Sequence, residues 1–163
     1  MDDQAHKPRG KRWLFVLMAG LLVLGVAFVA GMWFADRGER AVAAVTESYA
    51  GAYEGLDTTK DVPVLLPLYA PDAVLHDAAS GRTYRGAGEI ESALNALLAT
   101  PDFDLSIDRT LVGDGWALVF WTADGMRPDL DRVAQVVGVT SLEVSKGLIE
   151  RETWYYDPAK APF

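Results

Sequence analysis

The chain has 163 residues, and its 23 Asp and Glu outnumber its 15 Lys and Arg, which gives a formal net charge of −8. An acidic chain is repelled by phosphate backbones, so nucleic acid is not expected as a partner. The sequence has no cysteine, which excludes disulfides, thiol nucleophiles and cysteine-ligated metal sites.

A long uncharged segment at residues 13–35 dominates the N-terminal part of the chain. At about 1.5 Å per helical residue, residues 13–34 extend for about 33 Å, enough to cross a hydrocarbon core of about 30 Å. Trp13 and Trp33 lie near its two ends, where aromatic rings favour the membrane interface. These features predict a transmembrane helix that enters the lipid bilayer through residues 13–34.

The charges on the two sides of this segment predict its orientation. Residues 1–12 form a basic tail, whereas the charges just beyond the segment cancel. Basic flanks stay in the cytoplasm, so the following domain is expected outside the cell membrane, behind a single membrane pass. A signal peptide cleaved near Val29-Ala30-Gly31 is the alternative. The apolar run exceeds the usual signal core of roughly 7–15 residues, which favours a retained anchor.

The sequence predicts one α+β domain at residues 38–158, followed by a short C-terminal tail at residues 159–163. In the first half of this domain, apolar residues recur at helical spacing before and after one short strand. That strand is expected to end at Asp77, and Ser80-Gly81 then turns the chain. The helices and the strand are expected at residues 39–56, 61–69, 73–77 and 87–100.

The second half changes to the alternation of apolar and polar residues that is typical of half-buried strands. Gly113-Asp114-Gly115 marks one hairpin turn, and Ser145-Lys146-Gly147 marks another. Helices followed by an antiparallel meander indicate an α+β fold with the helices packed on one face of the sheet. The four strands are expected at about residues 103–112, 116–123, 132–144 and 148–156.

Two stretches of the sequence carry a family resemblance. Residues 69–90 combine an aromatic-Ala-x-Asp-Ala turn, a strand ending in Asp and an Arg-Gly pair before a helix. Residues 147–158 combine a Gly-x-Ile strand with a Tyr-Asp ending. Over residues 40–158 the chain therefore resembles the SnoaL-like, nuclear transport factor 2-like superfamily, which shares the ketosteroid isomerase-like fold. The resemblance implies a homodimer of cone-shaped α+β domains, each with helices on a curved, mainly antiparallel sheet around an apolar pocket.

Ketosteroid isomerase is the most specific comparison within this superfamily. Its general-base Asp matches the strand position of Asp77, and its oxyanion-donating Tyr lies 24 residues earlier, at Tyr53. The resemblance implies that Asp77 acts as a general base and Tyr53 as an oxyanion donor. Two structural alternatives stay open. An Asp before Ser80-Gly81 commonly accepts hydrogen bonds from its own turn, and Tyr53 also suits a position in the core.

Three further residues are candidates for the pocket. The epoxide-hydrolase relatives have two cavity-facing positions on the last strand, which align with Glu152 and Trp154. Trp121 on a neighbouring strand is expected as a wall of the pocket. His76 has no second His at metal-ligand spacing, so neither a metal nor another cofactor is expected. The predicted pocket residues are Tyr53, Asp77, Trp121, Glu152 and Trp154.

The superfamily contains both enzymes and non-catalytic binding domains, so the fold alone leaves the activity open. The first hypothesis is an apolar pocket for a small hydrophobic ligand, or an interaction module, held outside the membrane. The alternative is an isomerase or cyclase-type enzyme that acts on a carbonyl compound, with Asp77 as base and Tyr53 as donor. The position of the Asp77 carboxylate separates the two hypotheses.

Overall fold

The structure, a computed structural model, describes residues 38–54, 62–127 and 132–163. Within these ranges, no helix combines the length and the apolar character that crossing a membrane requires. The predicted basic tail and membrane segment, at residues 1–35, lie outside the described residues. Gly38–Phe163 form one unit of the chain by their internal contacts.

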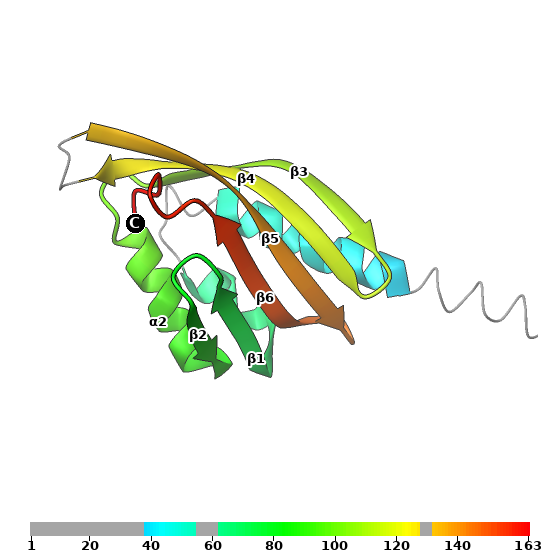
Figure 1. Ribbon diagram of the computed structural model, residues 1–163. Helices are drawn as coiled ribbons and strands as arrows, with labels where there is room; N and C mark the ends of the chain where they lie inside the picture. Colours follow the sequence, from blue (N-terminus) through cyan, green and yellow to red (C-terminus); the bar gives the residue numbers. More distant parts are fainter. Residues whose placement is uncertain (1–37, 55–61, 128–131) are drawn as a thin grey trace, which may run out of the picture. The chain divides into compact units, whose positions relative to one another are not determined.

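A six-stranded sheet in the order β2-β1-β6-β5-β4-β3 forms the framework of this unit (Figure 1). All neighbouring strands are antiparallel except β1 and β6, which are parallel. The predicted α+β fold with a mainly antiparallel sheet is therefore confirmed. The strands are β1 (Tyr69–Asp77), β2 (Arg82–Arg85), β3 (Asp104–Gly113), β4 (Trp116–Arg127), β5 (Arg132–Ser145) and β6 (Leu148–Tyr156).

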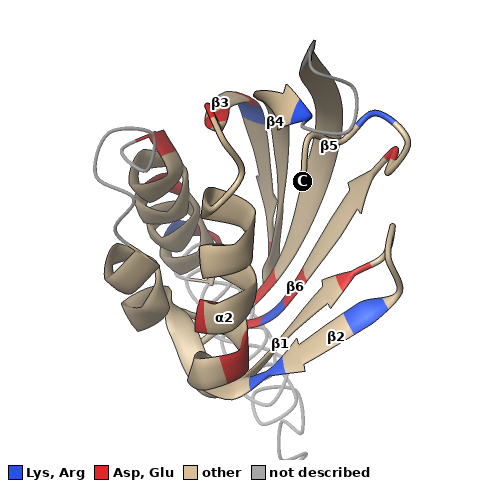
Figure 2. Ribbon diagram, turned by 90° about the vertical axis from the view of Figure 1, so that its left-hand side faces the viewer, with Lys and Arg blue, Asp and Glu red and all other residues tan. Residues whose placement is uncertain are grey.

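The helices gather against one face of the sheet (Figure 2). Residues 38–54 are helical and bury one stripe of side chains, because their apolar residues recur three or four positions apart. The second helix, α2 (Gly86–Leu98), buries a similar stripe that packs next to β1. The buried residues of the two stripes are Val42, Val45, Tyr49 and Tyr53 in the first helix and Ile90, Ala93, Leu94, Leu97 and Leu98 in α2.

The segment between these helices differs from the prediction. The predicted short helix at residues 61–69 is two 3₁₀ turns instead, η1 (Val62–Val64) and η2 (Leu66–Leu68). Pro67 lies at the start of η2, and closely spaced prolines remove the amide donors that an α-helix needs. Residues 70–72, predicted as a turn, belong to β1, whose pairing with β6 is irregular between Tyr69 and Val74. An irregular ladder tolerates Pro71, which has no amide donor.

The sheet is larger than predicted in two places. The chain after Ser80-Gly81 forms β2, which pairs with β1 and gives the sheet an extra edge strand. Strand β4 continues to Arg127, although a loop was predicted from Asp124, because Asp124 and Gly125 pair with Gln135 and Ala134 of β5. The ladder with β5 overrides the turn preference of an Asp-Gly pair.

The side of the sheet that faces the helices is apolar and aromatic. Alternate residues of β4 are buried there from Ala117 to Gly125, and Trp121 has the largest side chain among them. Trp121 lies opposite Gly138 of β5, and a Cβ atom at position 138 would be 2.2 Å from Cζ2 of the indole. The glycine therefore leaves the space that the Trp121 ring fills, and it sets the orientation of this ring toward the helices.

Candidate functional site

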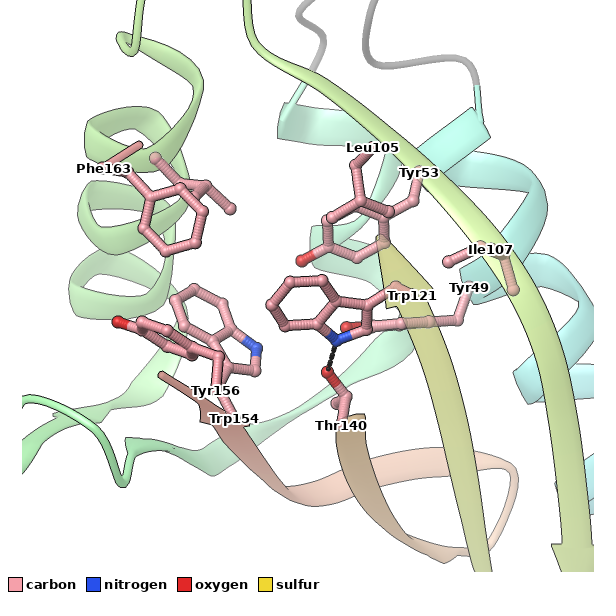
Figure 3. Close-up of a pocket in the computed structure, with 10 residues that line it drawn as sticks. Tyr49, Tyr53, Leu105, Ile107, Trp121, Thr140, Trp154, Tyr156 and Phe163 are labelled. Carbon is pink, nitrogen blue, oxygen red and sulfur yellow. Dashed lines mark hydrogen bonds between the residues drawn. The ribbon is translucent and has the colours of Figure 1, made fainter. Parts of the chain in front are cut away.

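An aromatic cavity lies between the helices and the sheet (Figure 3). Its volume of about 20 Å³ gives room for about one water molecule. None of its described lining residues carries a formal charge, and their polar atoms are hydroxyl and indole groups. The lining residues are Tyr49, Tyr53, Leu97, Leu105, Ile107, Trp121, Thr140, Trp154, Tyr156 and Phe163.

A buried carboxylate lies behind this lining. Glu152 on β6 has 0% of its surface exposed, because it occupies an inward-facing position of a strand that lies in the middle of the sheet. The hydroxyl of Tyr49 donates to its Oε1 atom, and the hydroxyl of Tyr69 donates to its Oε2 atom. The indole Nε1 of Trp154 donates to Oε1 over 2.5 Å. Three neutral donors therefore replace the water that this carboxylate loses on folding.

Burial changes the ionisation of every member of this cluster. Desolvation raises the pKa of Glu152, and the hydrogen bonds from Tyr49, Tyr69 and Trp154 only partly oppose it. Burial and then the negative charge of Glu152 raise the pKa values of Tyr49 and Tyr69 well above the ordinary value. The tyrosines thus stay protonated at neutral pH and act as donors.

Tyr53 extends this cluster toward the cavity. Its ring lies beside that of Tyr49, with 4.8 Å between the centroids. Burial, and then the negative charge of Glu152, raise the pKa of Tyr53 well above its ordinary value, and the interaction with Tyr49 only partly opposes this. Tyr49 donates its own proton to Glu152, so the two phenols differ in their partners although their rings are in contact. Because Tyr53 lines the cavity, its hydroxyl oxygen is within the space where a ligand could donate a hydrogen bond to it.

Asp77 occupies a different environment, at the end of β1. Its Oδ1 atom accepts from the backbone amides of Ala79 at 3.0 Å and Ser80 at 3.2 Å. Its Oδ2 atom accepts from the Ser80 hydroxyl and from the Tyr156 hydroxyl, the latter at 3.0 Å. Burial, and then this bond to Asp77, raise the pKa of Tyr156. The carboxylate is directed at its own turn, as the structural alternative from sequence describes.

Trp121 and Thr140 form the remaining polar contact of the cavity. The indole Nε1 of Trp121 donates to the Thr140 hydroxyl over 2.9 Å, a bond drawn as a dashed line in Figure 3. Thr140 has only 2% of its surface exposed. This bond and the gap at Gly138 fix the Trp121 ring as a wall of the cavity.

The structure brings three of the five predicted pocket residues together at the cavity: Tyr53, Trp121 and Trp154. The two predicted carboxylates are outside the lining. Glu152 is hydrogen-bonded to the lining residues Tyr49 and Trp154, and Asp77 is hydrogen-bonded to the lining residue Tyr156. Among the residues that the structure describes, no three His, Cys, Asp or Glu side chains are grouped closely enough to hold a metal ion.

Sequence reasoning did not assign several residues of the site, among them the aromatic residues Tyr49, Tyr69, Tyr156 and Phe163. The spacing in the sequence could have predicted Tyr49 and Tyr156 as pocket residues. Tyr49 precedes Tyr53 by one helical turn, and Tyr156 follows Trp154 on the same face of β6. Tyr69 had no such signal, because its role depends on the parallel pairing of β1 with β6. Phe163 lies in the predicted tail, which had no assigned contact with the domain.

The SnoaL-like domain family model matches residues 45–152, so the chain belongs to this family. A comparison with curated proteins found no significant match. Solved structures at low identity share the fold, and three examples illustrate the range.

The first example is a hypothetical protein with a ketosteroid isomerase-like fold from Catenulispora acidiphila, crystallised with trimethylamine. It has 19% identity and a TM-score of 0.61, and the match covers 71% of this chain and 87% of the other. An NTF2-like protein from Burkholderia xenovorans has 16% identity, a TM-score of 0.59 and coverage of 75% and 93%. A candidate SnoaL-like polyketide cyclase from Shewanella putrefaciens has 18% identity, a TM-score of 0.56 and coverage of 70% and 90%.

The raised pKa of Glu152 predicts a specific pH dependence of stability. The folded state holds the Glu152 proton to higher pH than the unfolded state does. The free energy of unfolding therefore falls as pH rises from 4.5 toward the folded-state pKa. The side chain that Glu152→Gln introduces does not titrate. The free energy of unfolding of the wild type should therefore fall relative to that of Glu152→Gln as pH rises over this interval.

Urea unfolding of both proteins between pH 4.5 and pH 8 measures this difference, and other carboxylates cancel in the comparison. Parallel pH profiles would contradict a raised pKa at Glu152.

Proposed function

We propose that the domain binds a small, mainly apolar molecule in the aromatic cavity. The observation that carries this proposal is the buried Glu152 cluster behind an otherwise apolar lining. A buried carboxylate contributes less to stability than well-packed apolar residues of the same volume would. Such a group, with a perturbed pKa beside a cavity, is a common mark of a functional site.

The contacts around Tyr53 suggest how the ligand is oriented. In this proposal, the ligand's apolar body lies against Trp121 and Trp154, and a ligand hydroxyl donates to the Tyr53 oxygen. Glu152 acts through Tyr49, because it holds the Tyr49 hydroxyl by a hydrogen bond and the Tyr49 ring lies beside that of Tyr53. The ligand is uncharged, since no described lining residue can neutralise an anion.

Binding in this cavity can be tested with 2-naphthol, an uncharged, flat molecule with one hydroxyl. Isothermal titration calorimetry on the full chain should detect binding to the wild type. Leu105→Trp fills the cavity and should weaken binding by roughly tenfold or more. A tenfold change in Kd corresponds to about 1.4 kcal/mol of binding free energy. Val133→Trp adds the same ring at a position that is 63% exposed and should leave binding unchanged. Equal binding by Leu105→Trp would place the 2-naphthol elsewhere.

A second candidate function is isomerase or cyclase-type catalysis with Asp77 as base and Tyr53 as donor. The family membership is compatible with it. The hydrogen bonds of Asp77 argue for the binding proposal, because a base whose oxygens accept from Ala79, Ser80 and Tyr156 must break some of them to reach a ligand.

Asp77→Asn separates the two candidates without a known substrate. An amide replaces one acceptor oxygen with a donor, which leaves a donor of the turn unpaired and should lower the free energy of unfolding by about 1–3 kcal/mol. Thermal melts measure the effect. Asp157→Asn is the matched control, because Asp157 also accepts from an amide two residues later but its side chain is 50% exposed. An unchanged melting temperature for Asp77→Asn, together with lost turnover of a carbonyl compound, would favour the enzyme.

We also propose a homodimer through the outer face of the sheet. Val137 is 65% exposed and Tyr155 is 49% exposed on this face. Phe120, Val139 and Tyr155 lie side by side across β4, β5 and β6. Phe120 and Val139 are half-buried, and together with exposed Val137 and Tyr155 they form a partly exposed apolar patch, which is a common feature of protein interfaces.

Sedimentation velocity tests the dimer. The wild type should sediment as a dimer at concentrations of about tens of micromolar. Val137→Glu should shift it toward the monomer, because a charge would be buried in the interface. Ser92→Glu adds the same charge on the exposed surface of α2 and should leave the dimer intact. A wild-type monomer under these conditions would contradict the proposal.

For the N-terminal part, we propose a single-pass anchor at residues 13–35 with the domain outside the cell membrane. The length of the uncharged run and the basic tail at residues 1–12 support it. A reporter that is active only in the cytoplasm, fused after Phe163, should give no signal. A strong signal, or a mature protein that begins after Gly31, would contradict the anchor.

A further inference from the structure

Residues 157–163 form a strap beside the mouth of the cavity. Several contacts hold it in place. The Asp157 side chain accepts from the amide of Ala159 at 3.0 Å, and Arg127 donates to the Ala159 carbonyl at 2.8 Å. Ala161 is buried, with 3% of its surface exposed. Pro162 packs so closely on Gly125 that a Cβ atom there would be 2.9 Å from the proline ring.

Phe163, at the end of this strap, differs from the other described lining residues of the cavity. All the others lie on a helix or a strand, where backbone hydrogen bonds hold them, whereas Phe163 lies outside regular structure. Its ring makes edge contacts with Tyr156, at 5.3 Å between centroids, and with Phe103, at 6.0 Å. Phe163 as a residue is nevertheless 38% exposed, and Figure 3 shows its ring beside that of Tyr156.

The small size of the cavity determines how a ligand could enter it. A volume of about 20 Å³ cannot hold an organic ring, which is several times larger than one water molecule. A ligand must therefore displace part of the lining. Displacing Trp121 or Trp154 breaks a buried hydrogen bond, whereas displacing the Phe163 ring breaks only aromatic contacts.

We propose that the Phe163 ring occupies a subsite for the flat, uncharged ring of the ligand, and that it leaves this subsite when the ligand binds. The ligand ring then makes the edge contacts with Phe103 and Tyr156 that Phe163 makes in the free protein. This subsite rests on the proposed function, because it assumes that the cavity binds a small molecule. It adds the ligand class, an uncharged aromatic or similarly flat cyclic compound with a hydroxyl for Tyr53.

The subsite predicts that weakening the Phe163 contacts strengthens binding. Isothermal titration calorimetry of 2-naphthol with the full chain should give roughly tenfold tighter binding for Phe163→Ala, because the free protein no longer has to open the subsite. Gly125→Ala should act in the same direction, since its Cβ atom pushes Pro162 away. Lys160→Ala removes an exposed ion pair between Lys160 and Asp157 on the same strap. Such a pair contributes little to stability, so this variant should bind as the wild type does.

A matched ligand tests the chemistry of the subsite. 2-Naphthoate has the same rings with a carboxylate in place of the hydroxyl, and it should bind at least roughly tenfold more weakly than 2-naphthol, because its charge loses water without gaining a cation. Thermal melts confirm that each variant is folded.

The outcomes separate the subsite from the proposed function. Binding of 2-naphthol that is equal or weaker in a folded Phe163→Ala variant would overturn the subsite and leave the binding proposal standing. Absence of binding to the wild type and to every folded variant would overturn the proposed function and the subsite with it.

Discussion

The burial of Glu152 is the constraint on which the rest of this domain depends. A carboxylate without water needs donors at fixed positions, and here they come from three separate elements. Tyr49 belongs to the helix at residues 38–54, Tyr69 begins β1, and Trp154 lies on β6 beside Glu152 itself. One side chain thus fixes the distance between the first helix and the sheet, and it makes the back of the cavity polar while its walls stay apolar.

The two predicted carboxylates show how environment separates chemically similar groups. Asp77 lies at a strand end, where backbone amides and hydroxyls of a turn satisfy it. Glu152 lies in mid-strand, where only side chains can reach it. The first is therefore suited to fixing a turn, and the second to fixing the tyrosines that face a ligand. Tyr156 connects the Asp77 turn to the cavity, so the two environments share one wall.

Periodicity was enough to predict the helices and most of the strands, because each element buries one face. It could not predict the parallel pairing of β1 with β6, which places Leu75 opposite Glu152. That pairing is non-local, and it decides that Tyr69 meets Glu152. The resemblance located Tyr53, Trp121, Glu152 and Trp154 near one another, but which atoms donate and which accept depends on side-chain geometry. The two 3₁₀ turns were missed because Pro63 fits the first turn of a helix, whereas Pro67 prevents that helix from continuing to residue 69.

The same parallel pairing has a consequence for the order in which the chain folds. Strand β6 is the neighbour of both β1 and β5, so it joins the early part of the sequence to the late part. Contacts between distant segments form slowly, because a long loop must close first. The β3-β4-β5 meander can form from local turns, whereas β1 and β2 have no place in the sheet until β6 is available. A ribosome-bound chain that ends before residue 148 therefore holds two separate partial sheets and an incomplete set of donors, and folding is completed by the last strand.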